Sequence, residues 1–151
     1  MYGLRSNGEV VAINDNVNSG TKKWSYNLAS SYTSALLAIN SNTLFVNTSA
    51  GKLIAINKDD GTKKWETTSL NYSSIAISGN TLYAVKDCQA VEARDISDLS
   101  VSKGTLRWSI SNNSCGTDMI PAGGMLLIKF NNTIKAFEAT SGGGSVGITI
   151  N

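Results

Sequence analysis

The chain has 151 residues, with 13 basic and 11 acidic side chains and no histidine, and this length suffices for one domain with a sizeable core. A net charge of +2 gives no strong electrostatic reason to expect nucleic acid or an anionic membrane surface as a partner. Without histidine the chain lacks the commonest general base and every imidazole metal ligand. Because no apolar run approaches the roughly 18 residues of a membrane-spanning helix and Met1 to Arg5 lack the features of a signal peptide, we expect a soluble chain with no membrane insertion and no targeting segment.

Short strands separated by turn residues are predicted along the whole chain. Apolar residues alternate or form short runs rich in β-branched and aromatic side chains, never at helical spacing over ten or more positions, so almost no helix is expected. After an opening strand at the N-terminus, the expected strands are 9–14, 21–28, 34–39, 43–47, 52–57, 62–68, 73–77, 81–85, 89–94, 105–110, 118–122, 125–130, 133–137 and 145–150. Together these make 15 strands.

One hairpin skeleton returns along the chain. An apolar strand ends on alanine, a polar turn closes on glycine, and the next strand carries a tryptophan four residues after that glycine. The copies are Ala12, Gly20 and Trp24; Ala55, Gly61 and Trp65; Ala93, Gly104 and Trp108; and Ala136 with Gly142, where Val146 stands in place of the tryptophan. The alanines lie 43, 38 and 43 residues apart. A period near 40 indicates a solenoid, a propeller or an array.

The repeat predicts an all-β propeller, or an arc of one. Four short antiparallel strands per repeat describe one blade, and the repeat units are approximately 1–42, 43–79, 80–123 and 124–151, the last of them partial. Fifteen strands make about 3.75 blades of four strands. The small alanines allow close approach of stacked sheets and the tryptophans fill the groove between blades, so Trp65→Ala is expected to cost about 3–5 kcal/mol.

The spacing of Ala55, Gly61 and Trp65, preceded by Gly51-Lys52-Leu53-Ile54, resembles the tryptophan-docking repeat of the quinoprotein (PQQ-like) β-propellers. The resemblance covers essentially the whole chain. It departs from that repeat at Asn14 and Asn57, where aspartate is usual, and at Gln89, where the leading glycine is usual. Propellers of this family resemble rings of roughly six to eight blades, so the resemblance implies about half a ring.

Three interpretations of the half ring remain open. The chain is a segment of a longer protein, which we favour, or an arc that pairs with a second copy, or a small ring of four blades with one strand missing. An open arc leaves an apolar blade face and unpaired strand edges in water. If the chain exists alone, we therefore expect a dimer or higher oligomer.

No catalytic residue is assigned. The carboxylates that a reaction would need are scattered, and we expect them to be solvated: Asp87, Glu92, Asp95, Asp98, Asp118 and Glu138. Glu92 and Glu138 lie beside repeat alanines, so either could face a central channel. The segment 14–20 places oxygen side chains at alternate positions, as a calcium loop does, but it lacks the glycine and the bidentate glutamate of such a loop, so we interpret it as a hairpin turn.

Cys88 and Cys115 are the only cysteines. They form either a disulfide that staples the third unit, which we favour, or two buried free thiols. Four Asn-x-Ser/Thr sequons begin at Asn47, Asn71, Asn112 and Asn131. The compartment stays open, with the periplasm or the cell surface favoured. Tyr26, Tyr32 and Tyr72 are candidate exposed aromatic residues of a binding face.

The expected function is that of a non-catalytic propeller scaffold or protein-interaction module. The expected partner is another protein, or a second copy, that completes the propeller. One alternative is a fragment of a PQQ- and calcium-dependent dehydrogenase, and only under it are PQQ and calcium expected as cofactors. The resemblance counts against it, because the dehydrogenases of this family carry two adjacent bridged cysteines and this chain has no adjacent pair. A further alternative is a propeller that binds a small molecule or a sugar.

Overall fold

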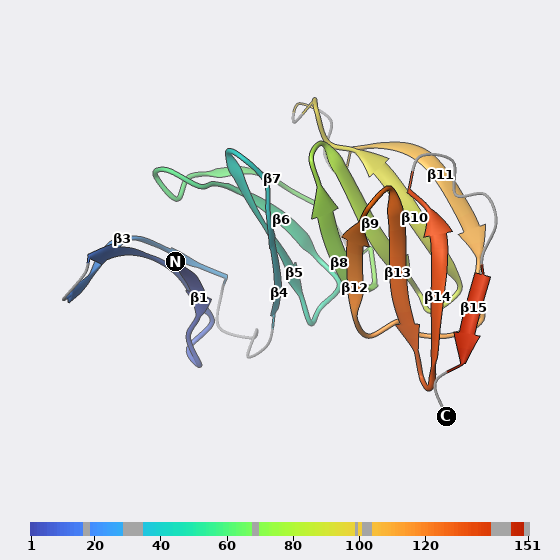
Figure 1. Ribbon diagram of the computed structural model, residues 1–151. Coiled ribbons are helices and arrows are strands. Elements are labelled where there is room, and N and C mark those ends of the chain that lie inside the picture. Colours follow the sequence, from blue (N-terminus) through green and yellow to red (C-terminus); the bar gives the residue numbers. More distant parts are fainter. Residues whose placement is uncertain are drawn as a thin grey trace. The chain divides into compact units, whose positions relative to one another are not determined.

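The computed structural model of the chain describes residues 1–16, 19–28, 35–67, 70–98, 100, 104–139 and 146–149 (Figure 1). The chain divides into two compact units, Met1–Ser69 and Leu70–Asn151. The described residues form fifteen strands, all paired antiparallel, and no helix, as the sequence predicts. The described residues therefore contain no helix that is long and apolar enough to cross a membrane.

Unit 1 holds two sheets. The first has three strands, β1 (Tyr2–Leu4), β2 (Glu9–Asn16) and β3 (Ser19–Asn27). The second has four strands, β4 (Ala35–Ile39), β5 (Thr43–Thr48), β6 (Leu53–Asn57) and β7 (Lys63–Glu66). In both sheets each strand pairs with the next one along the chain, which is the meander that short polar turns produce.

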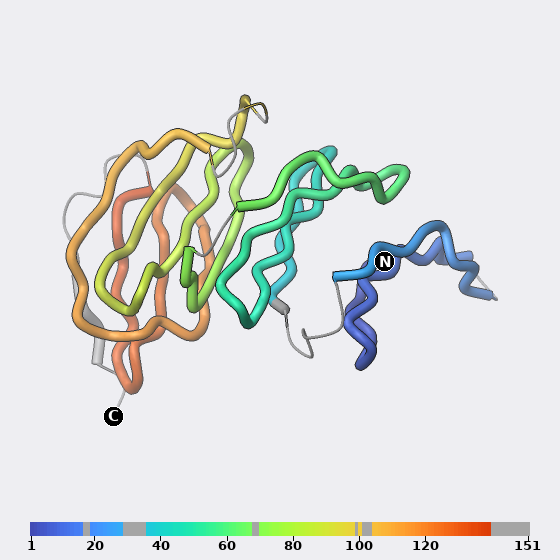
Figure 2. The backbone as a smooth tube through the Cα atoms, turned by 180° about the vertical axis from the view of Figure 1, so that it is seen from behind, coloured from blue at the N-terminus to red at the C-terminus, as the bar shows by residue number. Residues whose placement is uncertain are grey.

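Unit 2 holds two sheets of four strands. One consists of β8 (Tyr72–Ser78), β9 (Thr81–Lys86), β10 (Ala90–Asp95) and β11 (Thr105–Ser111). The other consists of β12 (Met119–Ala122), β13 (Met125–Phe130), β14 (Thr133–Glu138) and β15 (Val146–Thr149). Figure 2 shows the chain passing back and forth through neighbouring strands of each sheet.

Each unit has its own apolar core between its two sheets. The core of unit 1 is built from Val10, Ala12, Trp24, Leu28, Leu44, Val46, Ile54 and Ile56. The core of unit 2 is built from Tyr83, Val85, Val91, Ala93, Leu126, Ile128, Phe130 and Phe137. Alternate residues of a strand face opposite sides of its sheet, so every second residue of the inner strands enters the core.

The sheets are offset from the sequence repeat by one strand. The strand at 34–39 falls in the first repeat unit by sequence, yet β4 pairs with β5 and belongs to the second sheet. The sheets of three, four, four and four strands therefore add up to the expected 3.75 blades, with the incomplete one at the start of the described chain.

Candidate functional site

The repeat residues meet across three adjacent strands. In the first sheet Tyr2 of β1 stands opposite Ala12 of β2, which stands opposite Trp24 of β3. The same ladder recurs as Phe45, Ala55 and Trp65 and as Tyr83, Ala93 and Trp108. The two rings of each ladder lie 5.8, 5.9 and 6.1 Å apart, with the small alanine between them. Aromatic rings at such tilted geometry attract one another beyond their buried area.

Within unit 1, Trp24 docks the first sheet onto the turn between β6 and β7. Its indole Nε1 donates to the carbonyl oxygen of Lys58 at 2.9 Å, and the Tyr2 hydroxyl donates to the same oxygen at 3.4 Å. The ring lies on Gly61, where an added Cβ would come within 2.7 Å of the indole. Gly61 also has a φ of 77°, so both the backbone and the contact require glycine at this position.

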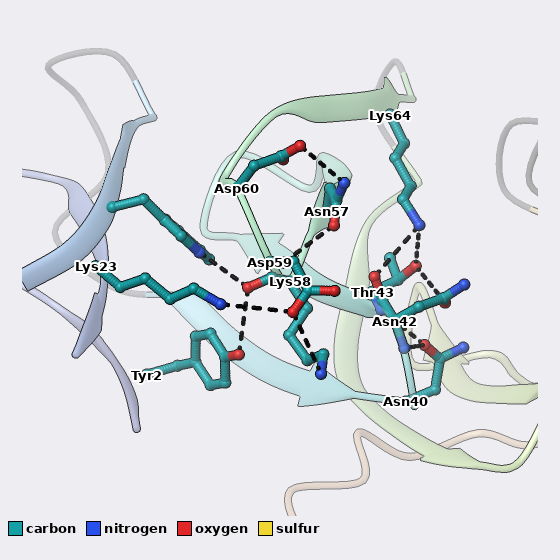
Figure 3. Close-up of polar contacts among 11 residues, drawn as sticks. Tyr2, Lys23, Asn40, Asn42, Thr43, Asn57, Lys58, Asp59, Asp60 and Lys64 are labelled. Atoms are coloured by element: carbon teal, nitrogen blue, oxygen red, sulfur yellow. Dashed lines mark hydrogen bonds and ion pairs between the residues drawn. The ribbon is translucent and has the colours of Figure 1, made fainter. Parts of the chain in front are cut away.

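The turn that receives Trp24 is held by its own side chains. Asp60 accepts hydrogen bonds from the backbone N–H of Thr62 at 2.9 Å, from the Thr62 hydroxyl at 2.7 Å and from the Asn57 amide at 3.1 Å. The bonds from Thr62 hold the pKa of Asp60 below its usual range. Asp59 forms ion pairs with Lys23 at 3.5 Å and with Lys58 at 3.6 Å (Figure 3). The docking site is therefore preformed and its carboxylates are already engaged.

Each tryptophan follows a bulged basic residue. The register slips after Ala12, Ala55 and Ala93, which leaves Lys23, Lys64 and Arg107 without a residue directly opposite. Lys64 donates to the Thr43 hydroxyl at 2.8 Å, and Arg107 donates to the equivalent Thr81 hydroxyl at 2.9 Å. These side chains remain exposed, but the contacts of Lys64 and Arg107 tie the fourth strand of each of their sheets back to the second strand.

Unit 2 contains a buried polar cluster that the sequence analysis missed. Glu92 is 5% exposed, and its Oε2 lies 2.8 Å from Nε and Nη2 of Arg94. The Tyr72 hydroxyl donates to the same oxygen at 3.3 Å, and Lys86 lies 3.8 Å from Oε1. Burial raises the pKa of Tyr72 to about 12.

Two expectations are wrong here. Glu92 is not solvated, because strand alternation puts it on the same face as Arg94, and the two charges are buried as a pair. Tyr72 is not an exposed aromatic, since it is 4% exposed. Tyr26 is half-buried against the core of unit 1, and Tyr32 lies outside the described residues. The signal for the cluster was present as opposite charges two residues apart on one strand.

The other acidic side chains are exposed or paired at the surface. Asp87, Asp98, Asp118 and Glu138 are exposed, as expected. Asp95 accepts from the backbone N–H of Ser97 at 2.8 Å and from Arg107 at 2.7 Å. The Ser97 side chain, Arg107 and the Ser97 backbone hold the pKa of Asp95 well below its usual range.

The described carboxylates do not form a calcium site. No group of three or more acidic or cysteine side chains that could hold a metal occurs in the described part of the chain. The donor chemistry explains this, because Glu92 faces Arg94 and Asp95 faces Arg107 rather than a shared cavity. In the described part of the segment 14–20, Asp15 pairs with Gly20 and Asn16 with Ser19 across β2 and β3.

Cys88 and Cys115 are joined by a disulfide with a Cα–Cα distance of 4.2 Å. Cys88 lies in the turn between β9 and β10 and Cys115 in the loop after β11. Next to the bridge, Gly116 lies so close to Val85 and Ile128 that an added Cβ would come within 3.0 Å of each. The bridge thus ties the β11–β12 loop to the β9–β10 turn of the same unit.

The two edges of β1 differ. Met1 exchanges backbone hydrogen bonds with Ile13, and the Arg5 N–H donates to the Glu9 carbonyl, so Tyr2 and Leu4 point their N–H and C=O groups away from β2. No described strand pairs with that side of β1. Beside it lies a pocket of about 130 Å³, lined by Tyr2, Leu37, Ala38, Ile39 and Leu44.

Antiparallel sheets with tryptophan docking between them at a period near 40 residues define the class as a β-propeller of PQQ-like repeats. The family model described as outer membrane protein assembly factor BamB matches residues 6–145, and the chain belongs to this family.

Solved propellers show the same fold at low identity. BamB from Moraxella catarrhalis is 19% identical with a TM-score of 0.72, over 96% of this chain and 44% of that one. Saccharomyces cerevisiae Sqt1 is 17% identical with a TM-score of 0.76, over 98% of this chain and 43% of that one. Among curated protein sequences, none is significantly similar to this chain. The chain spans less than half the length of either propeller.

Proposed function

We propose that this chain is a propeller module without catalytic activity of its own, which binds other proteins. The observation that carries the proposal is the apolar surface of β4. On β4, Leu36 is 42% exposed and Ile39 is 44% exposed. Leu37 and Ala38 between them are only half-buried. Exposed apolar side chains that cluster on one strand are typical of a site that another polypeptide covers.

The family supports the same role. Its description names an outer membrane protein assembly factor, and a factor that assembles proteins must contact them. The site residues agree with this, because the carboxylates that a reaction would use are engaged in ion pairs or turn bonds. The repeat residues Trp24 and Gly61 serve the docking of sheets. The other side chains of the described surface are therefore available for contact with another protein.

Site-specific photo-crosslinking in the cells that make the protein tests this proposal. A photoreactive side chain replaces Leu36 in one sample, and in matched samples it replaces Leu106 or Ile120, which are 47% and 60% exposed. We expect a protein adduct from at least one position. Absence of protein adducts from all three, with stoichiometric uptake of PQQ and calcium by the purified chain, would overturn the proposal.

A further inference from the structure

Four Asn-x-Ser/Thr sequons take no part in the proposed function, and the structure separates them. N-linked glycosylation joins a sugar to the side-chain nitrogen of asparagine, and the transferring enzyme also recognises the hydroxyl two residues further on. A sequon that carries a sugar in a folded chain therefore needs its asparagine at the surface and its hydroxyl within reach. The four sequons begin at Asn47, Asn71, Asn112 and Asn131.

Two of the asparagines are buried. Asn47 is 4% exposed and Asn112 is 6% exposed. The carboxamide of Asn112 is engaged at both ends, since its nitrogen donates to the Ser114 carbonyl and its oxygen accepts from Lys135 at 3.4 Å. A sugar is bulky and strongly hydrated, so at either position it would displace packed atoms. Neither asparagine is therefore suited to carry a sugar in this fold.

Asn71 is exposed, but the fold holds its sequon against unit 2. The Asn71 carbonyl accepts from the Asp87 N–H at 3.0 Å. The next residue, Tyr72, is 4% exposed. The Ser73 hydroxyl, which completes the sequon, donates to the Val85 carbonyl at 3.4 Å. The structure therefore presents the asparagine of this sequon and engages its hydroxyl.

The Asn131 sequon lies in a hairpin turn. Phe130 at the end of β13 stands directly opposite Thr133 at the start of β14 (Figure 1). Asn131 and Asn132 between them form the whole turn, and both are exposed. Within the described part of the chain, no hydrogen bond engages the carboxamide of Asn131 or the hydroxyl of Thr133. Asn131 has a φ of 51°, a conformation that asparagine adopts more readily than most residues.

The exposure of this turn comes from its place in the sheet. The corresponding turns of the other sheets are exposed too, at Asn7 between β1 and β2, at Ala50 between β5 and β6 and at Asp87 between β9 and β10. Turns at the ends of strands lie beyond the faces on which sheets pack. A group attached to Asn131 is therefore surrounded by water whatever packs on the faces of its sheet.

The disulfide supports the modification through the compartment that it requires. Cys88 and Cys115 are bridged, and disulfides form and persist in oxidising compartments such as the periplasm and the cell exterior. Sugars are attached to Asn-x-Ser/Thr in secreted chains, at surface loops. The bridge and the exposed sequon thus point to the same side of a membrane.

We propose that Asn131 is an N-linked glycosylation site. The sugar donor is an oligosaccharide linked to a polyprenol through phosphate. The side-chain nitrogen of Asn131 bonds to the anomeric carbon of the first sugar, the bond from that carbon to the phosphate oxygen breaks, and the polyprenyl phosphate leaves. The nitrogen gives one proton to a base of the transferase and keeps the other. This inference does not depend on protein binding by the module.

Tryptic digestion tests the site directly, because it leaves each of the four sequons on a different peptide. Cleavage after the flanking lysines isolates residues 130–135, which contain the Asn131 sequon and no other. The protein is purified from the cells that make it, and the peptides are analysed by mass spectrometry. We expect this peptide mainly with a sugar attached. Detection of the peptide only without sugar would overturn the proposal, and so would sugar on Asn47 or Asn112 in its place.

Variants of the same turn provide matched controls. Thr133→Ala removes the hydroxyl and keeps Asn131, so it should abolish the modification, and Thr133→Ser should restore it. Asn132→Gln changes the other exposed amide of the turn and should leave the modification in place. Each variant keeps asparagine at the position with positive φ, and circular dichroism checks that it folds. Sugar that persists in Thr133→Ala, or that disappears in a folded Asn132→Gln, would contradict the site.

Discussion

Both units dock their sheets through a tryptophan, but the tryptophan is buried to a different extent in each unit. In unit 1 Trp24 is 8% exposed and donates to the Lys58 carbonyl at 2.9 Å. In unit 2 Trp108 is only half-buried and donates to the Ala139 carbonyl at 3.3 Å. Yet unit 1 has the three-stranded sheet. Docking therefore depends on the last three strands of a sheet.

The tryptophans test this comparison most strongly. Trp24→Ala should lower the free energy of unfolding by about 3–5 kcal/mol, because it empties a buried site and removes the donor to Lys58. Trp108→Ala should cost less, since part of its ring already meets solvent. Urea unfolding of both variants measures the difference. Equal losses, or a loss below about 1 kcal/mol for Trp24→Ala, would show that docking does not differ between the units.

The disulfide is a feature of unit 2 alone among the described residues. It links positions 27 residues apart, so Cys88→Ser with Cys115→Ser should cost about 2–4 kcal/mol, chiefly by releasing the unfolded chain. Hydrogen exchange should speed up most in β9–β11. Reductant should reproduce the loss in the natural chain and have no effect on the double variant. A loss spread evenly over β1–β7 would contradict a local staple.

The Tyr72 cluster gives unit 2 a dependence on alkaline pH. The pKa of Tyr72 is raised to about 12, above the ordinary value near 10. The unfolded chain therefore loses this proton first as pH rises. The contribution of protonated Tyr72 to the free energy of unfolding is complete below pH 10. It is lost between pH 10 and 12, by about 2–3 kcal/mol. Urea unfolding of the natural chain and of Tyr72→Phe should converge over this range, and parallel curves would refute the assignment.

Two glycines at positive φ separate backbone strain from docking. Gly79→Ala changes a residue with φ 55° and no atom near the added Cβ, whereas at Gly61 the Cβ meets the Trp24 ring. Gly79→Ala should cost about 1 kcal/mol. Gly61→Ala should cost about 1–3 kcal/mol more, from overpacking. In the background of Trp24→Ala this excess should vanish, and its persistence would place the cost elsewhere.

The fold could be predicted from the sequence because the pattern that indicates it recurs along the chain. The Ala–Gly–Trp skeleton at a period near 40 indicates stacked sheets, and strand alternation predicts which residues face the core. Gly61 is required partly because the ring of Trp24, from the preceding sheet, lies against it. The sequence indicates this contact only through the spacing of the tryptophans.

Polar groups were harder to predict than apolar ones. The sequence shows Glu92 and Arg94 two residues apart, but their burial depends on what covers that face of the sheet. The bridge between Cys88 and Cys115 was one of two possibilities, because the sequence does not show that the β9–β10 turn and the loop after β11 lie together. Propensity and periodicity act along the chain, whereas these contacts depend on pairing across it.

Because the register slips after each of these repeat alanines, the connection to the tryptophan strand can change in length without moving the tryptophan. From alanine to glycine the chain takes eight positions in the first copy (12 to 20), six in the second (55 to 61) and eleven in the third (93 to 104). In all three the alanine still stands opposite its tryptophan. Apart from the β6–β7 turn, which receives Trp24, these connections thus accept inserted sequence at little cost to the ring contacts. They are the places where this scaffold can display a grafted peptide, and where related chains are free to differ in length.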